Sequence, residues 1–215
     1  MPKTKAQITV SLDGYMAGPN QTAKEPLGEG GEALHEWAFK LATWRDPHGR
    51  EGGEGDENPS NAVLAAAQEN IGAVVMGRNM FGPAPDARPD EDWIGWWGED
   101  PPFHCPVYVL THHARDPFEL EGANSFHFVT EGIEKAMAEA KEAADDQDVS
   151  IGGGASTLQQ AIAAGLLDEL LVSQVPILLG GGERLFDGLE AGAAKVELAS
   201  VVEGHDALHL TYRFD

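Results

Sequence analysis

The sequence predicts an α/β protein: one largely parallel sheet with helices on both faces and an antiparallel hairpin at the C-terminal end. Short apolar segments alternate with segments of helical periodicity along most of the chain, and this alternation is typical of strand–helix–strand units. Only a short polar turn separates the last two strand-like segments, 196–202 and 207–214, as in a hairpin. The sequence contains no internal repeat and no low-complexity linker, so we expect a single domain over 1–215.

Each expected element depends on a local pattern. Apolar residues at helical spacing predict an amphipathic helix over 32–44. Polar composition rich in glycine or proline predicts loops at 18–31, 46–58 and 82–102, and loops as long as the last are often functional. The expected strands lie at 8–17, 73–76, 107–111, 126–129, 149–151, 170–175, 196–202 and 207–214. The other expected helices lie at 61–70 with Gly72 as the C-terminal glycine, at 131–144, and at 156–165 with Ser156 as the N-cap.

The composition excludes several classes of protein. Of 215 residues, 42% are hydrophobic and 23% are charged, which is typical of a globular chain. The net charge is -22, from 14 basic and 36 acidic residues, and such a surface repels nucleic acid and anionic lipid. No apolar run reaches the roughly 18 residues that span a bilayer, the N-terminus does not resemble a signal peptide, and Cys105 is the single cysteine. We therefore expect a cytoplasmic protein with neither nucleic acid nor membrane as a partner.

Ligands of parallel α/β sheets bind at the carboxyl ends of the strands, and one such end carries three glycines. Gly152, Gly153 and Gly154 follow a strand and precede Ala155 and Ser156 at the start of a helix. Glycine lets a diphosphate approach the backbone, and a helix N-terminus supplies N–H groups and a partial positive charge. The alternative is a tight strand-to-helix turn that binds nothing.

Two further strand ends carry groups that suit phosphate. Arg78 follows a buried strand in the turn Gly77-Arg78-Asn79, and a guanidinium holds phosphate through paired N–H donors. Thr111 and His112, with His113 and Arg115, follow another strand with no acidic residue among them, which suits a ribose 2′-phosphate better than a free 2′-hydroxyl. The alternatives are an arginine in a surface salt bridge and a polar turn.

The end of the first strand carries a candidate for substrate contact. Asp13 lies in Ser11-Leu12-Asp13-Gly14, directly before Tyr15. A carboxylate at this place can accept hydrogen bonds from the amino or imino groups of a heterocycle. The alternative is an ordinary Asp-Gly turn, which is a common local signal.

Taken together and in order, these motifs resemble a known family. The series is Ser11-Leu12-Asp13-Gly14, Met76-Gly77-Arg78, Val109-Leu110-Thr111, Gly152-Gly153-Gly154 and the segment Pro176-Ile177-Leu178-Leu179-Gly180-Gly181-Gly182-Glu183-Arg184-Leu185-Phe186. It is similar to the dihydrofolate reductase superfamily, and within it to the reductase of riboflavin biosynthesis (the RibD C-terminal domain) and its stand-alone relatives. The resemblance covers about Gln7 to Phe214 and implies a mainly parallel, eight-stranded mixed sheet with flanking helices and an antiparallel C-terminal hairpin.

The resemblance also implies a cofactor and an assembly. NADPH is expected across the sheet, with its diphosphate between the Gly77-Arg78 turn and the three-glycine turn. A cis peptide is expected at Gly152–Gly153, and the relatives commonly form homodimers. The expected cofactor-binding residues are Ala17 and Gly153 beside the nicotinamide, Arg78, Thr111 and His112 beside the 2′-phosphate, and with them Gly77, Asn79, Gly152, Gly154, Ala155 and Ser156.

Three departures limit what can be transferred from the family. The histidine, glutamate and paired cysteines of a zinc deaminase are absent, so the chain is not the bifunctional riboflavin enzyme. Dihydrofolate reductases carry a carboxylate in the first helix, where this sequence offers Glu32 and Glu36. No basic cluster is obviously placed for a ribose 5-phosphate. His104, Cys105, His112 and His113 do not have the spacing of a zinc site, so no metal is expected.

We therefore expect hydride transfer from NADPH to a small nitrogen heterocycle such as a pterin or pyrimidine, or to a related carbonyl or imine. Asp13 and Tyr15 are the expected catalytic residues, with Asp13 or a bound water assisting protonation. One alternative is a non-catalytic NADP- or nucleotide-binding protein of the same fold, and another is an oligomeric structural or stress protein with a vestigial pocket. The tryptophans at 93, 96 and 97 suit a substrate pocket, a dimer contact, or a loop pinned to its own domain.

Overall fold

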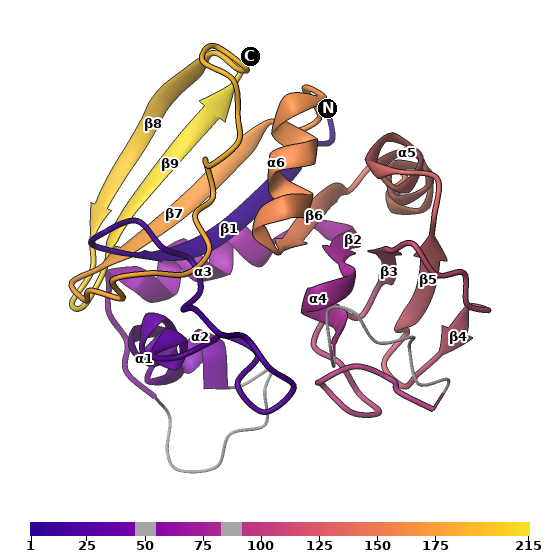
Figure 1. Cartoon of the computed structure of the whole chain (residues 1–215), viewed down its shortest axis with the longest axis horizontal. Coiled ribbons are helices and arrows are strands. Elements are labelled where there is room, and N and C mark those ends of the chain that lie inside the picture. Colours follow the sequence, from indigo (N-terminus) through magenta and orange to yellow (C-terminus); the bar gives the residue numbers. More distant parts are fainter. Residues whose placement is uncertain (46–54, 83–91) are drawn as a thin grey trace.

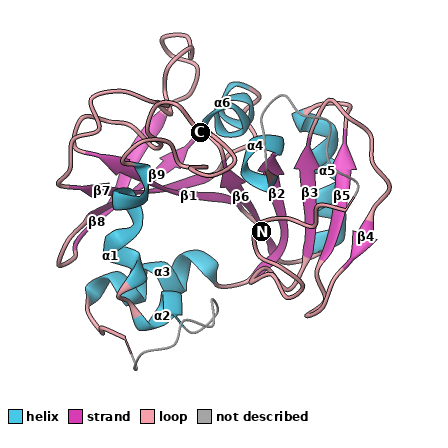
Figure 2. Ribbon diagram, turned by 60° about the horizontal axis from the view of Figure 1, so that its bottom comes forward, coloured by secondary structure: helices cyan, strands magenta, loops and turns pink. Residues whose placement is uncertain are grey.

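The computed structural model describes residues 1–45, 55–82 and 92–215, and this part of the chain forms one nine-stranded sheet with helices on both faces (Figures 1 and 2). The strand order is β4-β5-β3-β2-β6-β1-β7-β9-β8. The strands are β1 (Thr4–Ser11), β2 (Ile71–Gly77), β3 (Pro106–Leu110), β4 (Phe118–Glu119), β5 (Ser125–Val129), β6 (Asp148–Gly153), β7 (Glu169–Val175), β8 (Val196–Glu203) and β9 (Leu208–Phe214). The helices are the 3-10 helix η1 (Gly31–His35) and the α-helices α1 (Glu36–Phe39), α2 (Ala42–Arg45), α3 (Pro59–Gln68), α4 (Arg78–Phe81), α5 (Ile133–Ala144) and α6 (Ala155–Ala163).

The six strands from β5 to β7 are mutually parallel, and antiparallel strands flank them. The predicted fold class is therefore confirmed, including the antiparallel β8–β9 pair at the C-terminal end. The predicted number of eight strands was one too low because of β4, a two-residue edge strand at Phe118–Glu119. So short a segment carries no periodicity that a sequence pattern can reveal.

One face of the sheet is covered by α5 and α6. Alternate residues of the central strands, among them Ile8, Val75 and Ile151, pack there against Met137 and Leu158 in a continuous core. The apolar run of β2 is buried along almost its whole length, as expected for a central parallel strand with helices on both sides.

The opposite face carries two separate clusters. The first cluster joins η1, α1 and α3 to β7 and consists of Leu34, Trp37, Ala38, Leu41, Leu64, Val175 and Ala207. The second lies over β2, β3 and β5 and consists of Val74, Met76, Phe81, Cys105, Val107, Val109 and Phe126. Figure 2 shows α1, α2 and α3 grouped beside one part of the sheet, away from α5. The floor between the clusters is formed by β1 and β6, which lie between β2 and β7 in the sheet.

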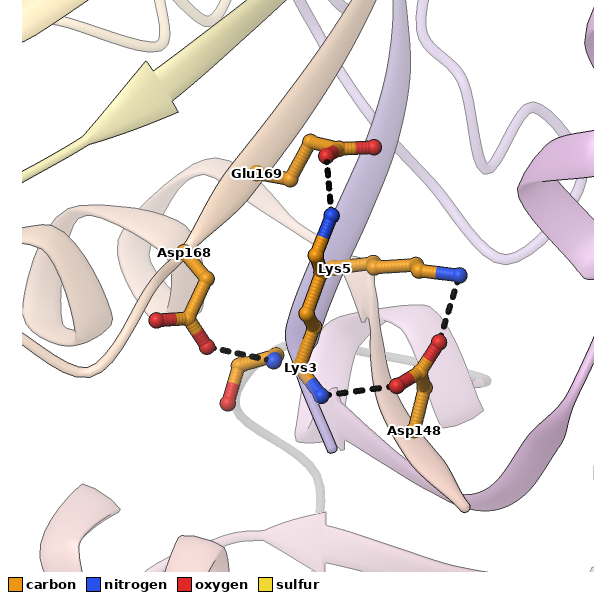
Figure 3. Close-up of polar contacts among 6 residues, drawn as sticks. Lys3, Lys5, Asp148, Asp168 and Glu169 are labelled. Atoms are coloured by element: carbon orange, nitrogen blue, oxygen red, sulfur yellow. Dashed lines mark hydrogen bonds and ion pairs between the residues drawn. The ribbon is translucent and has the colours of Figure 1, made fainter. Parts of the chain in front are cut away.

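The amino end of β1 is held by carboxylates of the two neighbouring strands (Figure 3). Asp148 accepts a hydrogen bond from the Lys3 backbone N–H at 2.7 Å and pairs with Lys5 Nζ at 2.5 Å. Burial on its own would raise the pKa of Asp148, but the hydrogen bonds from Lys5 and Lys3 outweigh it and lower the pKa. Asp168 accepts from the backbone N–H of Thr4 at 2.7 Å. These contacts explain why β1 begins at Thr4, earlier than the predicted strand at 8–17.

The predicted first helix over 32–44 is wrong as one element. The chain there forms η1, α1 and α2, and it breaks where Leu41 makes a bridge with Asp56. The predicted helix at 61–70 begins at Pro59 instead, because the Asn58 side chain accepts from Ser60 N and caps it, and it ends at Gln68. Gly72 lies inside β2 rather than at a helix end.

The three-glycine turn also differs from expectation in two details. The residue that precedes α6 is Gly154, with no side-chain cap, so Ser156 is not the N-cap. The Ser156 hydroxyl instead accepts from Gln160 Nε2 at 3.2 Å. The cis peptide lies at Gly153–Gly154 and not at the expected Gly152–Gly153.

The two long loops are described only in part, since 46–54 and 83–91 lie outside the described residues. In the described remainder of the second loop, Trp93 donates from Nε1 to the Phe81 carbonyl at 2.9 Å, and Trp97 packs on Phe103 with ring centroids 4.8 Å apart. Two tryptophans thus pin this loop to its own domain. Trp96 packs on Trp93 and is 36% exposed.

Candidate active site

A cavity of about 660 Å³ lies over the floor between the two clusters, and its walls include the carboxyl ends of β2, β3 and β6. Gln7, Thr9 and Gly152 belong to its floor, Leu27 and His35 come from the side of the first cluster, and Met80 and Trp97 come from the side of the second. Every predicted cofactor-binding residue lines this one cavity. These are Ala17, Gly77, Arg78, Asn79, Thr111, His112, Gly152, Gly153, Gly154, Ala155 and Ser156.

Two glycine turns meet at the start of α6. A methyl group on Gly77 would come within 2.5 Å of Thr157 Oγ1, so the absence of a side chain lets the end of β2 lie against α6. A methyl group on Gly154 would meet no atom within 4 Å. Because no side chain caps α6 and its first residues line the cavity, its first N–H groups are oriented for an anion. Figure 1 shows α4 and α6 following β2 and β6 at neighbouring strand ends.

Arg78 brings a positive charge to the cavity wall at the start of α4. Its side chain is only 9% exposed, and Nη1 donates to the Gly82 carbonyl. Burial, and then repulsion from Arg115, lower the pKa of Arg78 below its ordinary value, although a guanidinium remains protonated in proteins. A partly desolvated guanidinium suits the binding of phosphate.

Thr111, His112 and His113 line the cavity beyond β3. Thr111 is buried, and its Oγ1 accepts from the backbone N–H of His113 at 3.1 Å, whereas both histidines are exposed. Arg115, which the sequence grouped with them, lies outside the described cavity lining. Its guanidinium stacks 4.5 Å from the Phe118 ring centroid and donates to the Trp93 carbonyl at 2.6 Å.

Asp13 and Tyr15, the predicted catalytic residues, are not among the described residues that line the cavity. Asp13 accepts from Ser11 Oγ at 2.6 Å and from the backbone N–H groups of Leu179 and Gly180 at 3.1 and 2.8 Å. The bond from Ser11, followed by those from the backbone, lowers the pKa of Asp13 to about 2. The Tyr15 ring lies beneath the guanidinium of Arg184, at 4.2 Å from its centroid.

These contacts nevertheless connect Asp13 to the cavity. Asp13 ties its own turn to the segment at 179–183, and Ala17 bridges to Glu183 a few residues farther along both segments. Met16 donates its N–H to the Glu183 carbonyl at 2.8 Å. Met16, Ala17 and Glu183 all line the cavity. Asp13 therefore positions a part of the wall.

Sequence reasoning missed several lining residues, of which Gln7 and His35 matter most. Gln7 lies on β1 and His35 ends η1, and both line the cavity. In the first helical region, the exposed Glu32 and Glu36 are not among the described lining residues. A polar residue on the same strand face as Thr9 was the available signal for Gln7. No local pattern distinguishes His35 from its neighbours. The other lining residues missed include Gln21, Pro26, Leu27, Met80 and Gln160, whereas Trp96 and Trp97, for which the sequence offered a pocket as one interpretation, do line the cavity.

Neither a metal site nor a membrane-spanning helix is found in the described parts of the chain. Among these residues no group of three or more histidine, cysteine, aspartate or glutamate side chains is placed to hold a metal ion. No helix in the same ranges has the length and apolar character required to cross a membrane.

The sheet order and the cavity at its strand ends define a protein of the dihydrofolate reductase fold. Residues 2–210 match the RibD C-terminal domain family, and the chain belongs to that family. No curated protein matches the sequence.

Three solved structures are similar over nearly the whole chain. A protein assigned to riboflavin biosynthesis from Shewanella sp. PV-4 has 22% identity and a TM-score of 0.58, covering 99% of both chains. The dihydrofolate reductase of Enterococcus faecalis, solved with NADP(H) and RAB-propyl, has 16% identity and a TM-score of 0.53, covering 99% of this chain and 96% of that one. A pyrimidine reductase-like protein of Corynebacterium diphtheriae has 14% identity and a TM-score of 0.55, covering 100% and 92%. At these levels of sequence identity, the structural similarity shows that the chains share a fold.

Proposed function

We propose that this protein is an NADPH-dependent reductase that transfers hydride to a small nitrogen heterocycle. The observation that carries the proposal is that all the residues expected to hold NADPH, from four separate strand ends, line one cavity at the uncapped start of α6. Membership of the RibD C-terminal domain family and the reductase-like solved structures support an oxidoreductase. One of the similar structures was solved with NADP(H).

The residues present fit the cofactor, since the open space beside Gly154 is a cradle that a side chain would fill. The N–H groups at the start of α6 and the turn at Gly77 would hold the diphosphate. Arg78, Thr111 and His112, with His113, would hold the adenosine 2′-phosphate, and Ala17 and Gly153 would lie beside the nicotinamide. When bound, the reduced nicotinamide supplies the hydride, and the protein orients the acceptor against it and excludes water.

The assignment of the 2′-phosphate is tested by calorimetric titration with NADPH and NADH. Each charge-assisted contact to that phosphate contributes about 1.5–3 kcal/mol, so NADPH should bind at least about tenfold more tightly. Equal affinities would remove the 2′-phosphate assignment while leaving the diphosphate site intact.

The reductase itself is tested by substrate-dependent loss of the absorbance of reduced nicotinamide, with a panel of pterins, pyrimidines and flavin precursors. Turnover with at least one ring class is the expected result. A protein that binds NADPH tightly and oxidises it with none of them would instead be the non-catalytic binding protein of the same fold.

For Asp13 and Tyr15 we propose positioning roles: they hold the turn and the 179–183 segment from which Ala17 and Glu183 reach the cavity. We also propose a cytoplasmic location, because the single cysteine fits a reducing compartment.

We further propose a homodimer, as the family resemblance implies. The tryptophan loop gives little support, because two of its tryptophans pack on their own domain. More apolar surface is exposed on the edge strand β8, where Val196, Leu198 and Val201 are 47, 56 and 53% exposed. With a net charge of -22, association should tighten as salt screens the repulsion. Light scattering that shows a monomer at both low and high salt would reject the dimer.

A further inference from the structure

We propose that Gln7 and His35 recognise the substrate, and that they select an uncharged planar ring with N–H donors over a phosphorylated one. This inference rests on the proposed function, because it places the hydride acceptor in the part of the cavity next to the cofactor residues. Neither residue belongs to the motifs that carry the family resemblance.

The two side chains come from elements that pack against each other. Gln7 lies on β1, and His35 ends η1, which packs on that strand. Leu34, next to His35, belongs to the buried cluster that fixes η1 to this face of the sheet. Since both Gln7 and His35 line the same cavity, they form its wall on the side of the first cluster.

Gln7 Oε1 is a buried polar atom without a hydrogen-bond partner among the described residues, whereas the buried ring of His35 is hydrogen-bonded to the Gly31 backbone. Leaving such an atom unsatisfied costs about 1–3 kcal/mol, and buried polar atoms in proteins are almost always paired. Gln7 lines the cavity, so a ligand toward which its amide turns would supply the missing partner. A carbonyl oxygen such as Gln7 Oε1 only accepts, so the ligand must present an N–H or O–H donor to it.

The position of Gln7 suits a hydride acceptor. Ala6 pairs with Ile151 across the parallel strands β1 and β6, so the next residues along, Gln7 and Gly152, lie side by side on the cavity floor. Gly152 begins the glycine turn to which the nicotinamide is assigned. A ring hydrogen-bonded to Gln7 would therefore lie next to the nicotinamide, as hydride transfer requires.

The charges along the wall indicate which ring is selected. Arg78, His112 and His113 belong to the β2 and β3 side of the cavity, whereas Glu183 is the charged residue beside Ala17 on the other side, among the described lining residues. Burial lowers the pKa of His35, with a smaller opposing effect from the Gly31 backbone, so its imidazole is neutral near pH 7. A neutral imidazole, an amide and a carboxylate favour an uncharged donor-bearing ring and disfavour a phosphate.

The test uses the whole protein saturated with NADP⁺ and two matched probes, 6-hydroxymethylpterin and its phosphate ester. The wild type should bind the uncharged pterin at least about tenfold more tightly than the ester, and Gln7→Met and His35→Leu should each weaken pterin binding about tenfold, the effect of one lost hydrogen bond. Both variants should keep NADPH affinity within about twofold. Gln7→Glu keeps an acceptor oxygen and should retain most of the pterin affinity.

Glu36→Gln is the matched control, since Glu36 is the exposed neighbour of His35, and it should change neither affinity. If Gln7→Met and His35→Leu bind the pterin as the wild type does, or if the ester binds more tightly, the inference is wrong. If a variant loses NADPH affinity together with pterin affinity, its residue maintains the fold and does not recognise the substrate. A wild type that does not bind NADPH contradicts the proposed function itself, whereas one that binds NADPH but neither pterin contradicts only the substrate class.

Discussion

The two halves of β1 use polar side chains for opposite purposes. At the amino end, Lys3 and Lys5 pair with Glu169 and Asp148 from the neighbouring strands, at 3.0 and 2.5 Å. Farther along, Gln7 and Thr9 line a cavity, and Gln7 Oε1 has no partner among the described residues. The comparison shows that β1 is fastened to its neighbours at its start and carries polar side chains that line the cavity farther along.

The largest expected effect is a loss of NADPH affinity, caused by Gly154→Val at the cavity. Gly154 has an ordinary backbone conformation, φ -82° and ψ -161°, and open space beside it, whereas Gly153 has φ +123°, which side chains rarely adopt. A side chain at Gly154 would occupy the space assigned to the diphosphate, and loss of two charge-assisted contacts weakens NADPH binding by on the order of 100-fold. Calorimetry measures this, with Ala163→Val at the exposed far end of α6 as control. Normal NADPH binding by a folded Gly154→Val protein would mean that the turn is only structural.

The second effect is at the amino end of β1, in Lys5→Met. Lys5 and Asp148 are 19 and 10% exposed, so removal of the lysine leaves a largely buried carboxylate without its cation and should lower the free energy of unfolding by about 2 kcal/mol. Lys3→Met breaks a more exposed pair and should cost less than about 1 kcal/mol. Denaturant titration measures both. NADPH affinity should not change, and a change would show that the two ends of the strand are coupled.

The third effect tests the positioning role of Asp13. Asp13→Asn keeps the turn but weakens the bonds that hold Leu179 and Gly180, so turnover should fall about tenfold while NADPH affinity changes little. Because the pKa of Asp13 is lowered from 3.8 to about 2, its stabilising contribution is full above pH 3.8 and disappears as the pH falls toward 2. Steady-state kinetics with the substrate found by screening provides the measurement. A loss of 100-fold or more would favour direct catalysis, as the sequence first suggested.

The smallest effect concerns His209. Its two ring nitrogens lie 2.8 Å from Ser173 Oγ and 2.9 Å from Ser60 Oγ, so the residue links β9, β7 and α3. Burial lowers the pKa of His209 below 6.5, so its contribution to stability is full above pH 6.5 and is lost as the pH falls below that value. His209→Gln should make the loss of stability between pH 7 and 5 smaller, measured by denaturant titration at each pH. An unchanged pH dependence would show that other groups cause it.

The sequence by itself determined the fold class and the strand ends that meet at the cavity. Gly77 and Gly152 to Gly154 follow apolar strands directly, and such local signals are sufficient because the carboxyl ends of parallel strands converge at one edge of the sheet. This convergence of the strand ends can be predicted without knowing how the loops pack against one another.

The tertiary structure alone decided the cavity wall that includes His35. Asp13 receives two backbone N–H groups from residues 166 and 167 positions away, and Arg115 turns onto Phe118 because an aromatic face is available there. In the first helical region, the chain forms a 3-10 turn before α1, and a 3-10 helix has 3.0 residues per turn rather than 3.6. The change of period and the packing of Leu34 turn His35, and not Glu32 or Glu36, toward the cavity. Which side chain faces a ligand thus depends on the phase of the helix and on its packing, and neither is encoded in a local motif.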